Sequence, residues 1–130
     1  MAWSQDDTES FTITLTAFLE GKGIIRAILV SNRTQVITYA WDNGSWITPL
    51  PQAVEGDTII VIIHILNDGD ASDILFAEFV SDDVIVAQPL VESSSEILND
   101  GLDYLECNWE FTMPPKNVDI TLNAGHVEPD

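Results

Sequence analysis

Seven aspartates stand in short polar segments where their carboxylates could bind a cation. Three crowd one segment, and four occupy later turns that a sandwich could bring to the same end: Asp68, Asp70 and Asp73, then Asp82, Asp83, Asp100 and Asp103. Calcium takes about six to eight hard oxygen ligands, and loops of Asp and Asn with free carbonyls supply them. The EF-hand spacing is missing, because no Gly and Glu follow at the required intervals. Two interpretations therefore stay open, a calcium site or solvated turn residues.

Two tryptophans flank a predicted tight turn. Trp41 and Trp46 enclose Asn43 and Gly44, and Asn-Gly between β-forming residues is the strongest short signal for a hairpin. A two-residue turn there places the tryptophans directly opposite each other, an arrangement that stabilises hairpins. The pair either covers the core or forms an exposed platform for a sugar ring or a partner subunit. A glycan is therefore one expected partner.

Signatures of catalysis are missing from the sequence. His64 lies in an apolar run and His126 near the end of the chain, so the two histidines lack zinc-ligand spacing. Cys107, the single cysteine, shares a predicted strand face with Trp109, which indicates a buried side chain rather than a reactive thiol. Only a carboxylate pair in a cleft, as in glycoside hydrolases, stays open as a catalytic arrangement. We expect a protein that is not an enzyme, with no cofactor other than calcium.

The charge balance narrows the range of partners. The chain has 22 acidic residues against four basic ones, Lys22, Arg26, Arg33 and Lys116, and a formal net charge of −18. Phosphate binding needs clustered Lys and Arg, so neither nucleic acid nor an anionic membrane is an expected partner. Bound divalent cations, high salt or an acidic medium would each lower the repulsion between carboxylates. The alternative to these three conditions is that the negative charge simply keeps a β-rich protein soluble.

The longest apolar run, residues 58–80, is interrupted once by an acidic turn. Residues 59–66 are apolar except for His64, and their many Ile and Val side chains favour a pleated strand over a helix. Because both faces of this strand are apolar, we predict a central strand covered on both sides, by another sheet or by another subunit. Asn67, Asp68 and Gly69 then turn the chain.

Alternating apolar and polar residues predict further short strands. They are expected over residues 11–19, 24–30, 35–41, 74–80, 84–87, 105–111 and 118–122, and residues 91–98 fit either a strand or one helical turn. Gly, Asn, Asp and Pro separate them, and no convincing amphipathic helix is present. The pattern predicts an all-β fold, an antiparallel immunoglobulin-like β-sandwich, with a jelly roll as the alternative.

The same pattern divides the chain into three parts. The apolar fraction of 45% over 130 residues is that of one folded domain, which we place at residues 11–124. Residues 1–10 are polar and predict a flexible segment with Trp3 as an anchor, and residues 125–130 predict an acidic tail. No segment has the length of a membrane span or the character of a signal peptide.

The segment VIIHILNDGDASDILFAEFVSDDVIVAQ, residues 61–88, resembles the cell-adhesion-related domain called CARDB, an immunoglobulin-like sandwich of bacterial and archaeal surface proteins. In that family a strand ends in Asn-x-Gly, a small or hydroxyl residue follows, and the next hairpin has an acidic turn. The matching positions are Asn67, Gly69, Ser72, Asp82 and Asp83.

Two later segments extend the resemblance. Residues 99–101 resemble the turn before a late strand of the same family, and FTMP at residues 111–114 is similar to a closing motif of secreted β-sandwich repeats. The likeness covers roughly residues 55–124. It implies a sandwich fold and a role in adhesion or assembly, and it implies no catalytic residue.

We therefore expect a non-enzymatic structural protein, a self-associating subunit of a virion surface, a filament or a cell-surface layer. Its location would be the extracellular surface or a virion, and its partners further copies or other structural subunits. Strand exchange through residues 11–19 or through the last strand is the expected mechanism. The alternative is a calcium-dependent adhesion or glycan-binding module that uses the acidic loops together with Trp41 and Trp46.

Overall fold

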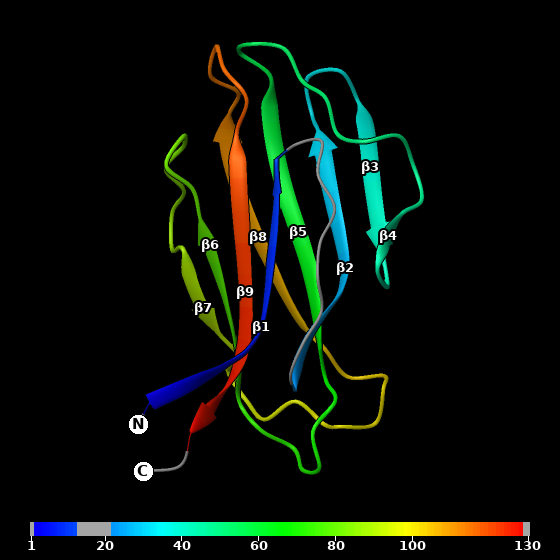
Figure 1. Ribbon diagram of the computed structural model, residues 1–130, viewed down its shortest axis with the longest axis vertical. Coiled ribbons are helices and arrows are strands. Elements are labelled where there is room, and N and C mark those ends of the chain that lie inside the picture. Colours follow the sequence, from blue (N-terminus) through cyan, green and yellow to red (C-terminus); the bar gives the residue numbers. More distant parts are fainter. Residues whose placement is uncertain (1, 13–21, 129–130) are drawn as a thin grey trace.

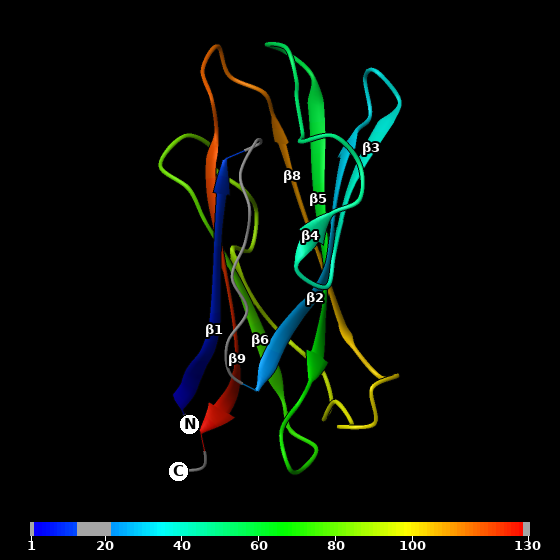
Figure 2. The same cartoon turned by 45° about the vertical axis from the view of Figure 1, so that its right-hand side comes forward.

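The computed structural model describes residues 2–12 and 22–128, which form two antiparallel β-sheets (Figure 1). The strands are β1 (Ala2–Thr12), β2 (Gly23–Asn32), β3 (Ile37–Asp42), β4 (Ser45–Trp46), β5 (Thr58–Asn67), β6 (Leu75–Val80), β7 (Leu90–Glu92), β8 (Leu105–Thr112) and β9 (Asp119–Glu128). One sheet has the order β1-β9-β6-β7 and the other β4-β3-β2-β5-β8. Figure 2 shows the two layers side by side. The described residues contain no helix, so the predicted all-β sandwich is confirmed.

The core depends on the strict alternation of side chains along β5. This strand pairs with β2 on one side and β8 on the other, which confirms its predicted central place. Its inward row is Ile59, Val61, Ile63 and Ile65, each no more than 1% exposed. The inward rows of the opposite sheet, among them Leu122, belong to the same hydrophobic cluster.

Within the described residues the other sheet covers one face of β5, so the predicted cover of the second face by another subunit stays a prediction. Ile60, Ile62 and Leu66 point away from the core and stay partly exposed. The reason is that the four-stranded sheet covers only the inner face of the five-stranded sheet. Among the described residues no third layer lies over the outer face.

The two chain ends also differ from the sequence predictions. Residues 2–10, predicted to be flexible, belong to β1, and residues 125–128, predicted as a tail, belong to β9. The two strands pair antiparallel from Ala2 opposite Glu128 to Thr12 opposite Asp119. Backbone hydrogen bonds form this ladder, so an edge strand needs little apolar sequence. Trp3 packs on Phe76 with ring centroids 5.6 Å apart, as expected of an anchor.

Three further predicted strands differ from the structure or lie partly outside the described residues. Residues 84–87 form no strand, and the chain there runs irregularly into β7. The residues predicted as strand over 91–98 are strand only in β7, while Ile97 makes an isolated bridge to Asp73. The strand predicted over residues 11–19 lies outside the described residues beyond Thr12.

The tryptophan hairpin is confirmed. Trp41 and Trp46 are direct partners in the β3–β4 ladder. Asn43 and Gly44 have φ angles of 45° and 104°, and Asn and Gly are the residues that adopt such left-handed angles at low cost.

We expect Gly125→Ala to destabilise the fold by about 2 kcal/mol or more, because overpacking forces backbone to move. A Cβ at Gly125 would lie 2.1 Å from the carbonyl oxygen of Ser4 in the adjacent β1. Gly44→Ala is the control, since its Cβ meets nothing within 4 Å and the cost is only that of a left-handed φ, about 1 kcal/mol. Urea unfolding of both variants measures the difference, and equal losses would contradict the close approach of β1 and β9.

Candidate functional site

The seven candidate calcium ligands do not gather at one place. Asp68, Asp70 and Asp73 lie in the loop between β5 and β6, and the loop before β8 lies at the same end of the sandwich (Figure 1). The side-chain amide of Asn99 donates to the carbonyl oxygen of Gly69 at 3.0 Å and joins these two loops.

The other two candidates lie elsewhere. Asp82 and Asp83 follow β6 at the opposite end, so the expectation that they share an end with Asp100 and Asp103 was wrong (Figure 1). The reason is that one strand, β6, separates the two acidic loops, and a strand connects opposite ends of a sandwich.

Several of these aspartates hold their own turns together. Both N–H groups of Leu102 and Asp103 donate to Asp100, and these bonds lower the pKa of the Asp100 carboxyl. Asp103 in turn accepts from the backbone N–H of Leu98 at 2.9 Å. Among residues 2–12 and 22–128, no three His, Cys, Asp or Glu side chains are placed to hold a metal ion. The hydrogen bonds that Asp100 and Asp103 accept show that both residues stabilise turns, and calcium binding stays a prediction.

An open cleft of about 410 Å³ lies beside the second acidic loop, and Asp82 and Asp83 are among its lining residues. The N–H of Asp119 donates to Asp83 at 2.8 Å, and the Lys116 ammonium lies 3.1 Å from the same carboxylate. Both contacts lower the pKa of Asp83. A general acid needs the opposite shift, so Asp83 is not suited to donate a proton near neutral pH.

The tryptophans do not form the exposed platform considered from the sequence. Trp41 is fully buried, with 0% of its surface exposed, and Trp46 is partly buried against the same core. Direct pairing across the hairpin places both rings on the inner face of the sheet. The pair closes the core, which was the other interpretation of the sequence.

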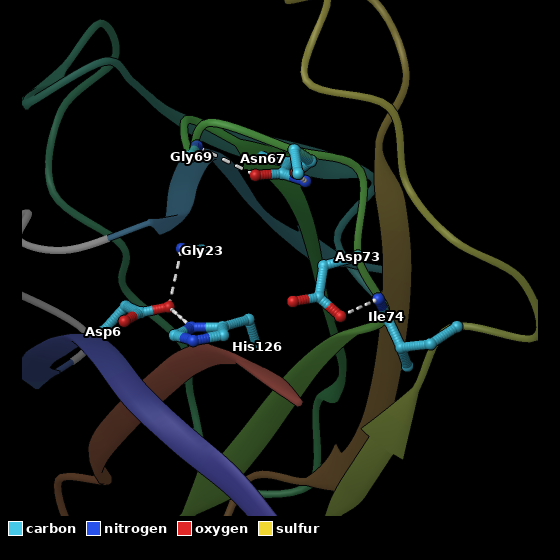
Figure 3. A network of polar contacts seen from close by, with 8 residues as sticks. Asp6, Gly23, Asn67, Gly69, Asp73, Ile74 and His126 are labelled. Carbon is cyan, nitrogen blue, oxygen red and sulfur yellow. Dashed lines mark hydrogen bonds and ion pairs between the residues drawn. The ribbon is translucent and has the colours of Figure 1, made fainter. Parts of the chain in front are cut away.

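A polar network ties the two sheets together at the end where the chain termini lie (Figure 3). His126, expected in a tail, belongs to β9, and its Nδ1 atom contacts the Asp6 carboxylate on β1. The N–H of Gly23, at the start of β2 in the other sheet, is 3.3 Å from the same carboxylate. Asp6 sits where the β1–β9 register shifts, and this bulge turns its side chain across the sandwich.

Asn67 explains the Asn-x-Gly pattern in physical terms. Its side-chain oxygen accepts from Gly69 N–H at 2.9 Å, and its amide donates to the carbonyls of Ala71 and Ile97 at 2.8 and 2.9 Å. The side chain is only 5% exposed and replaces backbone partners at the end of β5. Its role is therefore to hold a turn rather than to bind a ligand.

Sequence analysis missed the buried carboxylate of Asp57. Its Oδ2 atom accepts from the side-chain amides of Asn32 and Gln35, both at 2.8 Å, and from Val54 N–H at 3.0 Å. The Val54 N–H and then the Asn32 amide lower the pKa of Asp57. The Glu-Gly-Asp turn before the central strand was the only local signal, because the two side-chain amide donors, Asn32 and Gln35, lie 25 and 22 positions away.

The outer face of the five-stranded sheet carries a row of apolar side chains that no other described element covers with a third layer. We use the name outer face for these outward residues: Ile24, Arg26, Leu29 and Ser31 of β2; Ile60, Ile62, His64 and Leu66 of β5; Glu106, Asn108 and Glu110 of β8. Its centre is apolar, with an arginine on one side and two glutamates on the other.

Comparison with protein-family models, curated proteins and solved structures found no match. The resemblance to CARDB domains therefore stays a prediction from the sequence. Within the described residues, no helix is long and apolar enough to cross a membrane. The fold defines an all-β sandwich protein, and its outer face is the candidate functional site.

We expect the Cys107 thiol to resist alkylation in the folded chain. Burial, and after it the charge of Glu106, raises its pKa from 9.0 to about 12, which lowers the reactive thiolate about a thousandfold at a given pH. Iodoacetamide labelling followed by mass spectrometry compares the native chain with the same chain in denaturant. Equal labelling rates would contradict the burial of this residue.

We expect Asp57→Asn to lower the melting temperature at neutral pH, with a loss that shrinks in acid. The folded-state pKa of Asp57 lies below its ordinary value of 3.8, so its stabilisation is present above that pH. It disappears as the pH falls through the lower, folded-state value. Melting curves between neutral pH and strong acid test this against Glu55→Gln, an exposed neighbour outside the network. A difference from wild type that does not change with pH would refute the assignment.

Proposed function

We propose that this protein is a non-enzymatic structural subunit that works by self-association, and that the outer face is its contact surface. The observation that supports this is the outward row of β5. A strand with Ile and Leu on both faces is typical of a sheet that is covered on both sides. The chain supplies one cover, and a second copy would supply the other.

Three of the four edge strands favour contact through a face over contact through an edge, while β1, the fourth, has 11 residues and is long enough for strand pairing. β4 and β7 have two and three residues, too short to template a long strand pairing. The edge strand β8 alternates its buried residues with Glu106, Asn108 and Glu110, and charged outward rows oppose edge-to-edge pairing.

Strand exchange through the last strand, expected from the sequence, has less support than contact through the outer face. β9 lies between β1 and β6 and pairs with both along most of its length. A strand with two neighbours has no free edge to offer another subunit. Exchange through residues 11–19 concerns a segment outside the described residues beyond Thr12.

The proposal also includes a location for the assembly. We place the subunit on a virion surface, in a filament or in a cell-surface layer, at the extracellular surface. The resemblance of residues 55–124 to adhesion-related surface domains supports this location. Neither calcium nor a glycan is needed for contact through an apolar sheet face.

Net charge sets the conditions under which assembly is expected. With a formal charge of −18, two copies repel each other at low ionic strength. At about 0.15 M salt the screening length is about 8 Å, so repulsion between distant carboxylates falls while contacts within the interface persist. We therefore expect association to strengthen from low to physiological salt.

We expect Ile62→Lys to abolish self-association and to leave the fold intact. Ile62 lies at the middle of the outer face, where a charge on each copy would be buried against apolar side chains at high cost. Ile85→Lys makes the same chemical change at a residue that is 96% exposed and outside this face. Sedimentation velocity over a range of concentrations measures association, and urea unfolding checks stability.

Two results would count against the proposal. A wild-type chain that stays monomeric at high concentration, in salt and in calcium, would refute self-association. Equal association of the Ile62→Lys and Ile85→Lys variants would refute the outer face as the contact surface. A melting temperature that rises with calcium would instead favour the adhesion module.

A further inference from the structure

We propose that two copies pack outer face against outer face around a two-fold axis that runs along β5, so that Arg26 of each copy pairs with Glu106 of the other. This inference rests on the proposed function and adds the symmetry and the specific ion pairs. The partner is a second copy of this chain.

Three neighbouring strands, β2, β5 and β8, place Arg26 and Glu106 at one level. Ala27 on β2 pairs with His64 on β5, and His64 pairs with Glu106 on β8. The register of β2 shifts between Ile25 and Ala27, so Arg26 is the extra residue of a bulge at this level. Arg26 and Glu106 thus lie at the same height along the strands, one on each side of β5.

The bulge also orients Arg26. Ile25 and Ile28 both point into the core with 0% exposure, so the two residues between them are left for the outer side. The Arg26 guanidinium contacts Asp42. Trp41, the residue before Asp42 in β3, points into the core, so Asp42 points to the outer side. Arg26 is therefore on the outer face with its side chain 39% exposed, and Glu106 is 50% exposed.

The two-fold axis lies between the two outer faces and runs parallel to β5. Rotation about this axis brings β2 and β8 of the two copies into contact. Neighbouring strands lie about 4.8 Å apart, so β2 and β8 are equally distant from the axis. The rotation lays β2 of one copy over β8 of the other and does not change height along the strands. Arg26 then faces Glu106 of the second copy twice, and Ile60 and Ile62 meet their own copies at the axis.

The same rotation brings a second arginine of one copy toward a second glutamate of the other, at the opposite end of the face. Ser31 on β2 is level with Ile60, and Ile60 with Glu110 on β8. Arg33, exposed, follows two residues beyond Ser31, and its N–H donates to the Thr58 carbonyl at 2.8 Å. Two residues of strand span about 7 Å, which an arginine side chain can cover to reach Glu110 of the second copy. Two of the four basic residues of the chain thus face the glutamates of β8.

Charge disfavours a second two-fold packing of this face, in which the axis runs across the strands. An axis across the strands through Ile62 would lay β8 over β8 of the second copy. Asn108 is level with Ile62, so Glu106 of one copy would face Glu110 of the other at both ends. Opposed like charges disfavour that arrangement. The axis along β5 also keeps the strands of the two copies nearly aligned, as in other face-to-face sheet packings.

The contacts that Arg26 and Glu106 make within one chain are compatible with this pairing. Arg26 contacts Asp42, and a guanidinium has five N–H donors, enough for two carboxylates. Glu106 contacts His64 Nε2 at 2.9 Å through Oε1, which leaves Oε2 for a second donor.

The test mixes two charge-reversed variants, Arg26→Glu and Glu106→Arg. Each variant alone opposes like charges at both pairs, so we expect its dimerisation to weaken by about tenfold or more. A one-to-one mixture forms heterodimers in which both pairs are again opposite in charge, so we expect association close to that of wild type. The mean net charge of the mixture equals that of wild type, so recovery cannot come from a changed net charge.

The control mixes Arg26→Glu with Glu92→Arg, an exposed residue on β7 of the other sheet. This mixture has the same mean charge, and we expect no heterodimer of wild-type strength. Sedimentation velocity at physiological salt measures all samples, and urea unfolding confirms that each variant is folded.

The possible outcomes separate the two proposals. If wild type dimerises and Ile62→Lys prevents it, but the mixture stays as weak as its components, the two-fold pairing is wrong and the proposed function stands. Wild-type association by either single variant alone would also overturn the pairing. A monomeric wild type overturns both proposals together.

Discussion

The burial of the inward row of β5 is the constraint on which the rest of the structure depends. Ile59, Val61, Ile63 and Ile65 fill the centre of the core, and β2 and β8 are held in register on either side. Because side chains alternate along a strand, fixing this row inward fixes Ile60 and Ile62 outward. A sandwich of two layers covers only one of these faces, so the other keeps its apolar side chains outward.

The carboxylates of this strongly acidic chain have two distinct structural uses. Some are buried and replace backbone partners, as Asp7 and Asp57 do, with exposures of 2% and 3%. Others, such as Asp100, stabilise turns at the ends of the sandwich. The accepted N–H bonds lower the pKa of Asp57 and Asp100, so these two carboxylates stabilise the fold most above their ordinary titration range. The outer face differs, because its arginine contacts an aspartate on one side of an apolar centre and its two glutamates lie on the other.

The sequence predicted elements well where a strong local pattern existed. Alternation located β5 and β8, and Asn43-Gly44 located the hairpin, because both depend on neighbours within a few residues. It failed for β1, whose polar residues reach the sheet through backbone bonds to β9 more than 100 positions away. It also placed a strand over residues 84–87, where the chain forms no strand ladder although its side chains are partly apolar.

The sequence by itself determined that this chain is an all-β protein with a central apolar strand, because the two-residue period and the turn residues act locally. Only the tertiary structure decided which face of that strand would be covered, that Trp41 would point into the core, and that the acidic loops would divide between two ends. It also decided that Arg26 and Glu106 would stand level on either side of β5. Such relations depend on strand order and register between distant segments, which no local pattern of side chains specifies.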